Sequence, residues 1–350
     1  MALTYMHVDG AGAGDYSGST WANAMSFASF YTGETNSFDA VAAGYIYFFM
    51  GGQTYSLTSN ISTAIDGTAA DRIAIIGVAS GTTNEGAAID DADFAQGSDR
   101  PIFDGNTAYY IDLADYSGVE NCIAESGLYP ILLAAACIVK NCKVNTDYTG
   151  ATTRTLINCV SSYLKVINCE LFSDEAGTGL VYGVQGNIFC LIAFCYVHDM
   201  TTGSGSTGIT PYGTIPSVLF CIFDNLDKTV TVTSDESGIF FGCTFYDCDD
   251  ALPLTDGTAA SVINCIFSDC TTSAISSTAS TFSHLLMYNH FYNNGDNHLN
   301  VPEEGDAADL FCDWWATTGD PKFTTAGSDF SLQSDSPCID AGMAMALGVG

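Results

Sequence analysis

A short motif that recurs along the chain constrains the fold more than any other feature of this sequence. Asn-Cys, or a variant with Phe or Gly in place of Asn, ends at residues 122, 142, 169, 195, 221, 243 and 265, and Asn289-His290 continues the series with histidine at the cysteine position. Successive motifs lie 20 to 27 residues apart. A period of this length is typical of a solenoid, in which each repeat packs only against its neighbours.

Each repeat has the pattern of short β-strands. Segments such as residues 265–269 alternate inward and outward side chains and are separated by Gly, Ser, Thr and Asp, which are typical of turns. No convincing amphipathic helix occurs between residues 100 and 300. The sequence therefore predicts an all-β fold, a parallel β-helix with about three short strands in each coil and about 4.8 Å between coils.

The fourteen cysteines fit the interior of such a fold. No Cys-x-x-Cys pair occurs and histidine is scarce, so zinc clusters are not expected. Thiols are small and apolar, so one thiol from each coil would fill a narrow core as a column. The asparagines that precede the cysteines are expected at corners of the coils, where their amides can hydrogen-bond to one another.

We expect one domain over residues 1–350. Residues 1–60 form an N-terminal cap and the first coils, with a short helix over residues 20–28. Residues 61–300 form the central coils, and residues 301–350 form an irregular C-terminal cap. Early strands are expected at residues 45–49 and 72–76, where β-branched and aromatic residues gather.

The charge of the chain excludes some classes of partner. Lys and Arg number 8 and Asp and Glu number 40, which gives a net charge of −32. Nucleic acid and anionic membranes would be repelled, so neither is expected as a partner. No apolar segment reaches the roughly 20 residues that span a bilayer. The first ten residues also lack the pattern of a signal peptide, so none is expected.

The two ends of the sequence resemble a known superfamily. Residues 8–24 (VDGAGAGDYSGSTWANA) and 329–342 (DFSLQSDSPCIDAG) are similar to the ends of right-handed parallel β-helix proteins of the pectate-lyase-like superfamily. The resemblance implies a right-handed β-helix over essentially the whole chain, and commonly a trimer. It implies no single function, because the superfamily includes polysaccharide lyases, glycoside hydrolases, adhesins and bacteriophage spike or fibre proteins.

Lyase chemistry finds weak support in the residues. Uronate lyases of this superfamily use Lys or Arg as base and charge neutraliser, commonly with Ca²⁺ held by carboxylates. Four cations fall in neighbouring coils and are expected either to share a face or to be scattered on solvated turns: Lys140, Lys143, Arg154 and Lys165. A polyanionic substrate would also be repelled by the net charge of −32.

Aspartates give a second set of candidates. Glycoside hydrolases need two carboxyl groups, about 5–5.5 Å apart for retention or about 6.5–9.5 Å apart for inversion. Four aspartates follow their anchor cysteines by three or four residues and would form an acidic ladder: Asp199, Asp224, Asp247 and Asp269. Asp247, with Asp249 and Asp250, is also the candidate ligand set for Ca²⁺, the one cofactor that the sequence suggests. Solvated turns are the alternative for all of them.

The functional prediction depends on where such a chain folds. Free thiols and the lack of an export signal are unusual for a fold that resembles extracellular proteins, and a virion protein satisfies both, since it folds in the host cytoplasm and leaves by lysis. We therefore predict a non-catalytic structural protein of a bacteriophage-like particle: a spike, fibre or capsid-decorating subunit. We expect a homo-oligomer that contacts other virion proteins and surface glycans. The alternative is a polysaccharide-degrading enzyme, either a glycoside hydrolase or a lyase, or a glycan-binding depolymerase spike.

Overall fold

The structure is a computed structural model of the chain. It describes residues 3–14, 18–32, 44–62, 66–147, 151–173, 179–186, 189–201, 205–211, 216–230, 237–254, 259–277, 285–299 and 316–342. The chain divides into two compact units, one formed by residues 1–179 with 184–186 and the other by residues 180–183 with 187–350. The expectation of a single domain stays a prediction.

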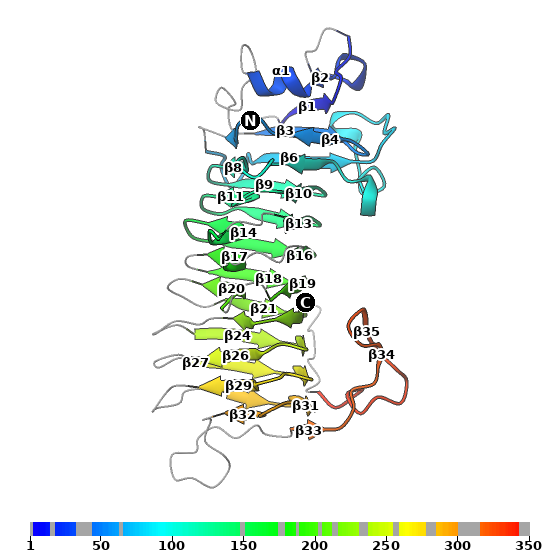
Figure 1. The fold of residues 1–350 in the computed structure, drawn as a ribbon. Helices are drawn as coiled ribbons and strands as arrows, with labels where there is room; N and C mark the ends of the chain where they lie inside the picture. The colour runs from blue at the N-terminus through cyan, green and yellow to red at the C-terminus, as the bar shows by residue number, and fades with distance from the viewer. Residues whose placement is uncertain are drawn as a thin grey trace. The chain divides into compact units, whose positions relative to one another are not determined.

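The first unit is built from short parallel strands in three sheets (Figure 1). The first sheet contains, in spatial order, β2 (Met25–Ser26), β1 (Thr4–Asp9), β3 (Tyr45–Met50), β6 (Ile73–Val78), β9 (Ser117–Glu120), β12 (Ile138–Lys140) and β15 (Leu164–Ile167). The second contains β4 (Thr54–Ser56), β7 (Ile102–Asp104), β10 (Ile123–Glu125), β13 (Lys143–Thr146) and β16 (Glu170–Ser173). The third contains β5 (Ile61–Ser62), β8 (Ile111–Leu113), β11 (Ile131–Leu133) and β14 (Arg154–Cys159), and β17 (Val181–Gly186) contributes residues to both units.

The second unit repeats the arrangement. Its first sheet contains β18 (Cys190–Ala193), β21 (Ser217–Leu219), β24 (Ser237–Phe241), β27 (Ala259–Ile263) and β30 (Leu285–Met287). Its second contains β19 (Tyr196–Met200), β22 (Ile222–Leu226), β25 (Thr244–Tyr246), β28 (Ile266–Ser268), β31 (His290–Tyr292) and β33 (Thr317–Thr318). Its third contains β20 (Thr207–Pro211), β23 (Lys228–Val230), β26 (Asp250–Leu254), β29 (Ser273–Ser277) and β32 (His298–Leu299). The antiparallel hairpin of β34 (Phe323–Thr325) and β35 (Asp329–Leu332) follows.

Consecutive strands belong to different sheets, and each strand pairs with one a full repeat away. Ile222, for example, pairs with Tyr196 on one side and with Thr244 on the other. Each repeat is therefore one coil of a parallel β-helix, as the period of the sequence predicts. Among the described residues, no helix is both long and apolar enough to cross a membrane.

The predicted column of thiols is confirmed. The anchor cysteines at 122, 142 and 169 in the first unit, and at 195, 221, 243 and 265 in the second, are each at most 2% exposed. The described cysteines are free, and all but Cys338 are buried. In the second unit a column of stacked phenylalanine rings adds to the core, with centroids 4.5–5.3 Å apart: Phe223, Phe245, Phe267 and Phe291.

The last copy of the motif is one residue out of the predicted alignment. Ile266 pairs with His290, so Asn289 and not His290 follows the cysteine column. Asn289 is fully buried, accepts a hydrogen bond from the backbone N–H of Cys265 (2.9 Å) and donates one to Val262 O (2.9 Å). A buried amide needs such partners, and these two backbone groups supply them.

The predicted asparagine ladder is present in the first unit. Asn141 donates to Asn121 (2.9 Å) and Asn168 donates to Asn141 (2.8 Å) through their side-chain amides. All three have φ between 52° and 57°, the left-handed conformation that Asn tolerates better than most residues. The ladder thus meets the steric demand of the corner and pairs successive side-chain amides, while the Nδ2 atom of Asn121, at the end of the ladder, is buried without a hydrogen-bond partner.

The predicted helix over residues 20–28 is wrong in its bounds. A 3₁₀ turn covers Trp21–Asn23, β2 pairs with β1, and the helix α1 covers Phe27–Thr32. Residues Met25 and Ser26 are held in a strand because they pair with Val8 and Asp9. The helix therefore begins only at Phe27. The strands predicted at residues 45–49 and 72–76 are confirmed as β3 and β6.

Candidate functional site

The outward face of β19, β22, β25, β28 and β31 in the second unit carries the predicted aspartates, and we call it the site face. Side chains alternate along these strands, so Phe223 and Phe245 point inward while their neighbours Asp224 and Tyr246 point outward. The register aligns one outward residue from each coil: His198, Asp224, Tyr246, Ser268 and Tyr292.

A second column lies at the corner that follows these strands. Asp199, Asn225, Asp247, Asp269 and Asn293 occupy it, with φ between 48° and 59°. Asp and Asn are the non-glycine residues that best tolerate this conformation, which explains their recurrence at the position.

The predicted ladder of four aspartates is therefore divided between the two columns. Asp199, Asp247 and Asp269 follow their cysteines by four residues and share the corner column. Asp224 follows Cys221 by only three residues, so it lies one position earlier, on the strand. The cause is the one-residue difference in spacing, which shifts a side chain to the neighbouring column.

Amides separate some carboxylates in the corner column but not all. Asn225 Nδ2 donates to Asp199 Oδ1 (2.7 Å), and Asn293 Nδ2 donates to Asp269 Oδ1 (2.6 Å). Asp247 and Asp269 follow each other directly, one coil apart. Burial, and then the negative charge of Asp269, raises the pKa of the Asp247 carboxyl above its ordinary value. Asp269 also accepts a hydrogen bond from Ser268 Oγ (2.6 Å).

Asp224 and Asp199 have contrasting surroundings. Asp224 is 6% exposed and accepts a hydrogen bond from the Tyr196 hydroxyl (2.8 Å); burial outweighs this bond and raises the pKa of its carboxyl. Burial also acts to raise the pKa of Asp199, but hydrogen bonds from His198 and Asn225 outweigh it, and the net pKa is lowered. His198 stacks on Tyr196 with ring centroids 4.1 Å apart.

A C-terminal segment, residues 316–342, packs against the site face. Strand β33 pairs with β31, and His290 Nε2 donates to Gly319 O (2.6 Å) while its Nδ1 lies 2.8 Å from Thr317 Oγ1. In the β34–β35 hairpin, the Phe330 ring packs edge-on against Tyr246 at 5.4 Å and against Phe323 at 5.2 Å.

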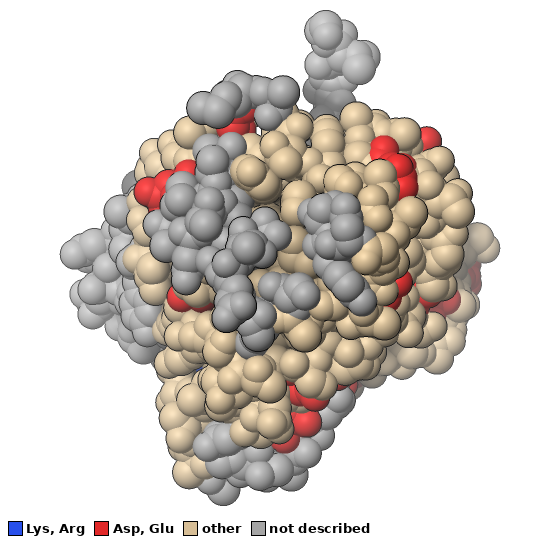
Figure 2. Space-filling view, turned by 90° about the horizontal axis from the view of Figure 1, so that it is seen from above, with Lys and Arg blue, Asp and Glu red and all other residues tan. Residues whose placement is uncertain are grey.

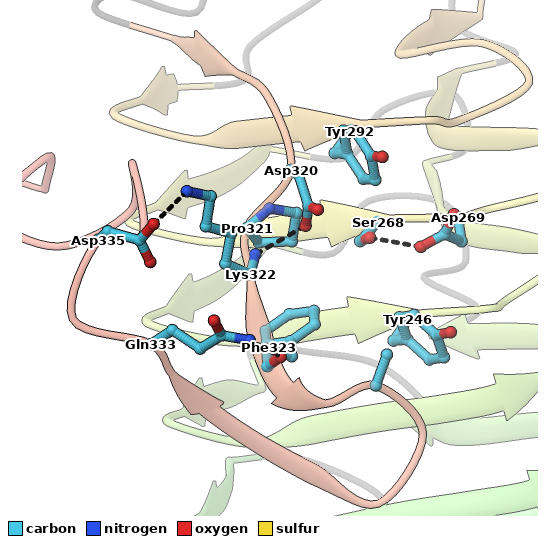
Figure 3. A pocket seen from close by; sticks show the side chains of 11 residues that line it. Tyr246, Ser268, Asp269, Tyr292, Asp320, Pro321, Lys322, Phe323, Gln333 and Asp335 are labelled. Carbon is cyan, nitrogen blue, oxygen red and sulfur yellow. Dashed lines mark hydrogen bonds and ion pairs between the residues drawn. The ribbon is translucent and has the colours of Figure 1, made fainter.

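A cavity of about 420 Å³ lies between the site face and this segment (Figure 3). The strands contribute Tyr246, Ser268, Asp269 and Tyr292, and the segment contributes Asp320, Pro321, Lys322, Phe323, Ala326, Gln333 and Asp335. Figure 3 shows the Lys322 side chain directed at Asp335, and their charged atoms lie 2.5 Å apart. The backbone N–H of Lys322 donates to Asp320 Oδ1 (2.8 Å).

The four cations proposed for lyase chemistry do not share a face. Arg154, in β14 of the third sheet, is fully buried. Lys143, in the second sheet, forms an ion pair with Glu170 at 3.3 Å and lies 4.4 Å from the Phe172 ring centroid. Lys140 and Lys165 belong to β12 and β15 of the first sheet. Neither alternative holds for all four: Lys140 and Lys165 lie on the outward side of neighbouring strands of one sheet, and all four cations lie in strands and not on solvated turns.

Two of the candidate calcium ligands, Asp249 and Asp250, accept hydrogen bonds from hydroxyl groups of the next coil. Asp249 Oδ1 accepts hydrogen bonds from the hydroxyls of Thr271 (2.8 Å) and Thr272 (2.5 Å) of the next coil. Asp250 accepts from Ser273 (2.5 Å) and Ser276 (2.9 Å) in the same way. Across the described ranges, no group of three or more His, Cys, Asp or Glu residues is arranged to hold a metal ion. Calcium binding stays a prediction.

Sequence reasoning identified Asp269 but missed the other residues that line the cavity. Tyr246 and Tyr292 each follow an inward phenylalanine, in Phe245-Tyr246 and Phe291-Tyr292, and this recurrence was the available signal. Asp320, Lys322 and Gln333 gave no such signal, because their approach to the strands depends on the path of the C-terminal segment.

Comparisons with known proteins agree on the fold. Residues 155–307 match the family model described as a right-handed β-helix region. The structure is similar to that of the pectate lyase Pel9A (TM-score 0.56, 11% identity, 99% of this chain and 93% of that one). It is also similar to an alginate lyase from Paenibacillus sp. (TM-score 0.51, 11% identity, 84% of this chain and 96% of that one). A search of curated proteins gave no significant match. The fold is a right-handed parallel β-helix, and identities this low show nothing beyond it.

Proposed function

We propose that the chain binds a polysaccharide along the site face and hydrolyses it with Asp247 and Asp269. The observation that carries this proposal is that two carboxylates follow each other one coil apart in the corner column and that one of them, Asp269, lines a cavity together with two tyrosines. Structural similarity to a pectate lyase and an alginate lyase supports a role in polysaccharide processing. Nothing in these comparisons supports the predicted virion role, which stays a prediction.

The geometry favours a retaining hydrolase. Neighbouring coils of a β-helix are about 4.8 Å apart, close to the separation of about 5–5.5 Å between the carboxyl groups of retaining glycosidases. Asp247, whose pKa is raised, suits the general acid. Asp269, held by Ser268 and Asn293, suits the nucleophile.

The reaction then has two steps. Asp269 attacks the anomeric carbon as Asp247 protonates the departing glycosidic oxygen, which leaves a glycosyl ester on Asp269. Water, deprotonated by Asp247, then attacks the same carbon and releases Asp269. The two tyrosines offer ring faces and hydroxyls to the sugar on either side of the reacting bond.

Lyase chemistry is less compatible with this site. It needs a cationic base and charge neutralisation at a uronate. Lys322 is the one cation among the described residues that line the cavity, and it is paired with Asp335. A hydrolase needs only carboxyl groups, which the site face supplies.

The proposal is tested with a panel of neutral, acidic and amino-sugar polysaccharides and a reducing-end assay. The wild-type chain is expected to release reducing ends from one of them, and Asp247→Asn and Asp269→Asn each to lower the rate by about 10²–10⁴-fold. Asp249→Asn is the matched control, since an amide oxygen still accepts the bonds from Thr271 and Thr272. Proton NMR of the first product should show retained anomeric configuration. No cleavage in the panel, or unchanged rates in both variants, overturns the proposal.

A further inference from the structure

We propose that the cavity beside Asp269 binds an amino sugar with a free ammonium group, and that the polysaccharide is therefore one with unacetylated hexosamine units. The inference rests on the proposed function and adds its substrate class. Its basis is the chemistry of the cavity lining and the charge of the chain.

The cavity has the size and composition of a ligand site. Its volume of about 420 Å³ falls within the range of about 300–1,000 Å³ for small-molecule sites. One wall comes from strands β25, β28 and β31, and the other comes from the C-terminal segment (Figure 3). Tyr246 and Tyr292 lie on strands two coils apart, a separation of about 9.6 Å along the stack. Two rings that far apart would face alternate units of a glycan chain, because one sugar unit spans only about half of that separation.

The charge of the lining selects against anionic sugars. Its ionisable carboxyl groups belong to Asp269, Asp320 and Asp335, and its cation is Lys322. The Lys322 ammonium pairs with Asp335, so its charge is compensated within the wall. Asp269 and Asp320 remain, one on each wall, and an ammonium group placed between them would gain two charge-assisted hydrogen bonds. A uronate carboxylate in the same place would be repelled by both.

The charge of the whole chain acts in the same direction. The net charge of −32 produces a field that draws cationic ligands to the surface and repels anionic ones. In Figure 2, Asp and Glu side chains are spread over the described surface in view, with almost no Lys or Arg among them. A polymer of hexosamine units with free ammonium groups is a polysaccharide that such a field attracts.

The test uses calorimetric titration of the full chain at low salt. Asp247→Asn serves as the parent protein, so that bound oligosaccharide is not cleaved. Three hexasaccharides of equal length are compared: glucosamine, N-acetylglucosamine and galacturonate. The glucosamine hexamer is expected to bind at least about tenfold more tightly than the acetylated one, a difference of about 1.4 kcal/mol, and the galacturonate hexamer not to bind. The preference should weaken as salt is added, because exposed charges are screened.

Matched variants locate the ammonium. Asp320→Asn, added to the parent, is expected to weaken binding of the glucosamine hexamer about tenfold and to leave the acetylated one unchanged. Asp329→Asn is the control, because it removes one charge from the same C-terminal segment outside the cavity. Equal affinity for the glucosamine and N-acetylglucosamine hexamers overturns the amino-sugar assignment, and so do equal effects of Asp320→Asn and Asp329→Asn on binding. Binding and cleavage of a neutral glycan would overturn the amino-sugar assignment but leave the proposed hydrolase intact. If no glycan is bound or cleaved, both the amino-sugar assignment and the proposed hydrolase are overturned.

Discussion

Phe245→Ala tests whether the interior phenylalanine column stabilises the second unit. Phe245 is fully buried and stacks on Phe223 at 5.2 Å and on Phe267 at 4.5 Å, with ring planes 12° and 3° from parallel. Truncation of a buried Phe to Ala costs about 3–5 kcal/mol. Each aromatic pair contributes about 0.5–1.5 kcal/mol beyond the burial of area. Because two pairs are lost and the rings above and below have little room to close the gap, we expect the upper end, about 4–5 kcal/mol.

Phe220→Ala is the matched control for this experiment. Phe220 also stacks on a ring of the neighbouring coil, Phe194 at 5.3 Å, but its side chain is at a corner and 44% exposed. About half of the 1.5–3 kcal/mol for burying a Phe side chain is at stake there, so we expect about 1 kcal/mol.

Urea unfolding followed by circular dichroism measures both variants, with the free energy of unfolding obtained from the midpoint and the slope. If Phe245→Ala does not fold, Phe245→Leu, which keeps most of the buried volume but loses both aromatic pairs, is expected to cost about 1–3 kcal/mol. Equal costs for Phe245→Ala and Phe220→Ala would refute the argument that burial, and not stacking alone, makes the column stabilising.

Three further predictions concern the thiols, the acidic corner and the asparagine ladder. Alkylation of the native chain at pH 8 should label few of the described thiols, because they are buried and burial raises the pKa of Cys137 and Cys248, for example, to about 12. Cys338, which is only half-buried, should react first but slowly, since burial raises its pKa to about 11. Unfolding should expose all fourteen, and mass spectrometry counts the labels. In Asp269→Asn, the pKa of Asp247, followed by carboxyl NMR, should fall because the negative neighbour is gone, yet stay above its ordinary value because burial, the larger cause, remains. Since a raised carboxyl pKa makes the folded state bind protons more tightly than the unfolded one, wild type should lose more stability than Asp269→Asn as pH rises through that pKa. Asn141→Ala should cost about 2–3 kcal/mol through two lost amide bonds and a left-handed alanine, and Asn141→Gly should cost less because only the bonds are lost.

The interior of the fold was predictable from sequence because each coil repeats the same steric problem. A narrow core needs a small apolar side chain at one point of every coil, and the anchor cysteines supply it with a period that survives changes in loop length. The asparagine ladder follows from the same repetition, since its corner demands both positive φ and satisfied amides.

The register at single positions was less predictable. A loop between two coils can be one residue longer or shorter, and the spacing of the motifs then still falls within its range of 20 to 27 residues. That is why His290 was assigned to the cysteine column, which Asn289 occupies. Only the backbone pairing of neighbouring strands decides such a shift, and pairing is not visible in one sequence. Asp224 is different, because its three-residue spacing from Cys221 was visible in the sequence and already separated it from the other three aspartates.

The cavity was out of reach of sequence reasoning for a different reason. Its two walls are separated along the chain by residues 293–319, and no period links them. The ring contacts of Phe323 and Phe330 with Tyr246 hold the C-terminal segment against the strands. These contacts are between aromatic residues that, in sequence alone, are indistinguishable from those of the core.

The corner columns show how a requirement of the fold yields chemistry. Left-handed corners select Asn and Asp for steric reasons, whatever the function of the chain. In the first unit the corner residues Asn121, Asn141 and Asn168 are all amides, which hydrogen-bond in series and offer no acid or base. In the second unit Asn225 and Asn293 each bind one aspartate, while Asp247 and Asp269 stand next to each other. An amide at either position would extend the ladder of hydrogen bonds, whereas the chain has carboxylates at both, and these two, with Asp269 in the lining of the cavity, are the acid–base pair of the proposed hydrolase.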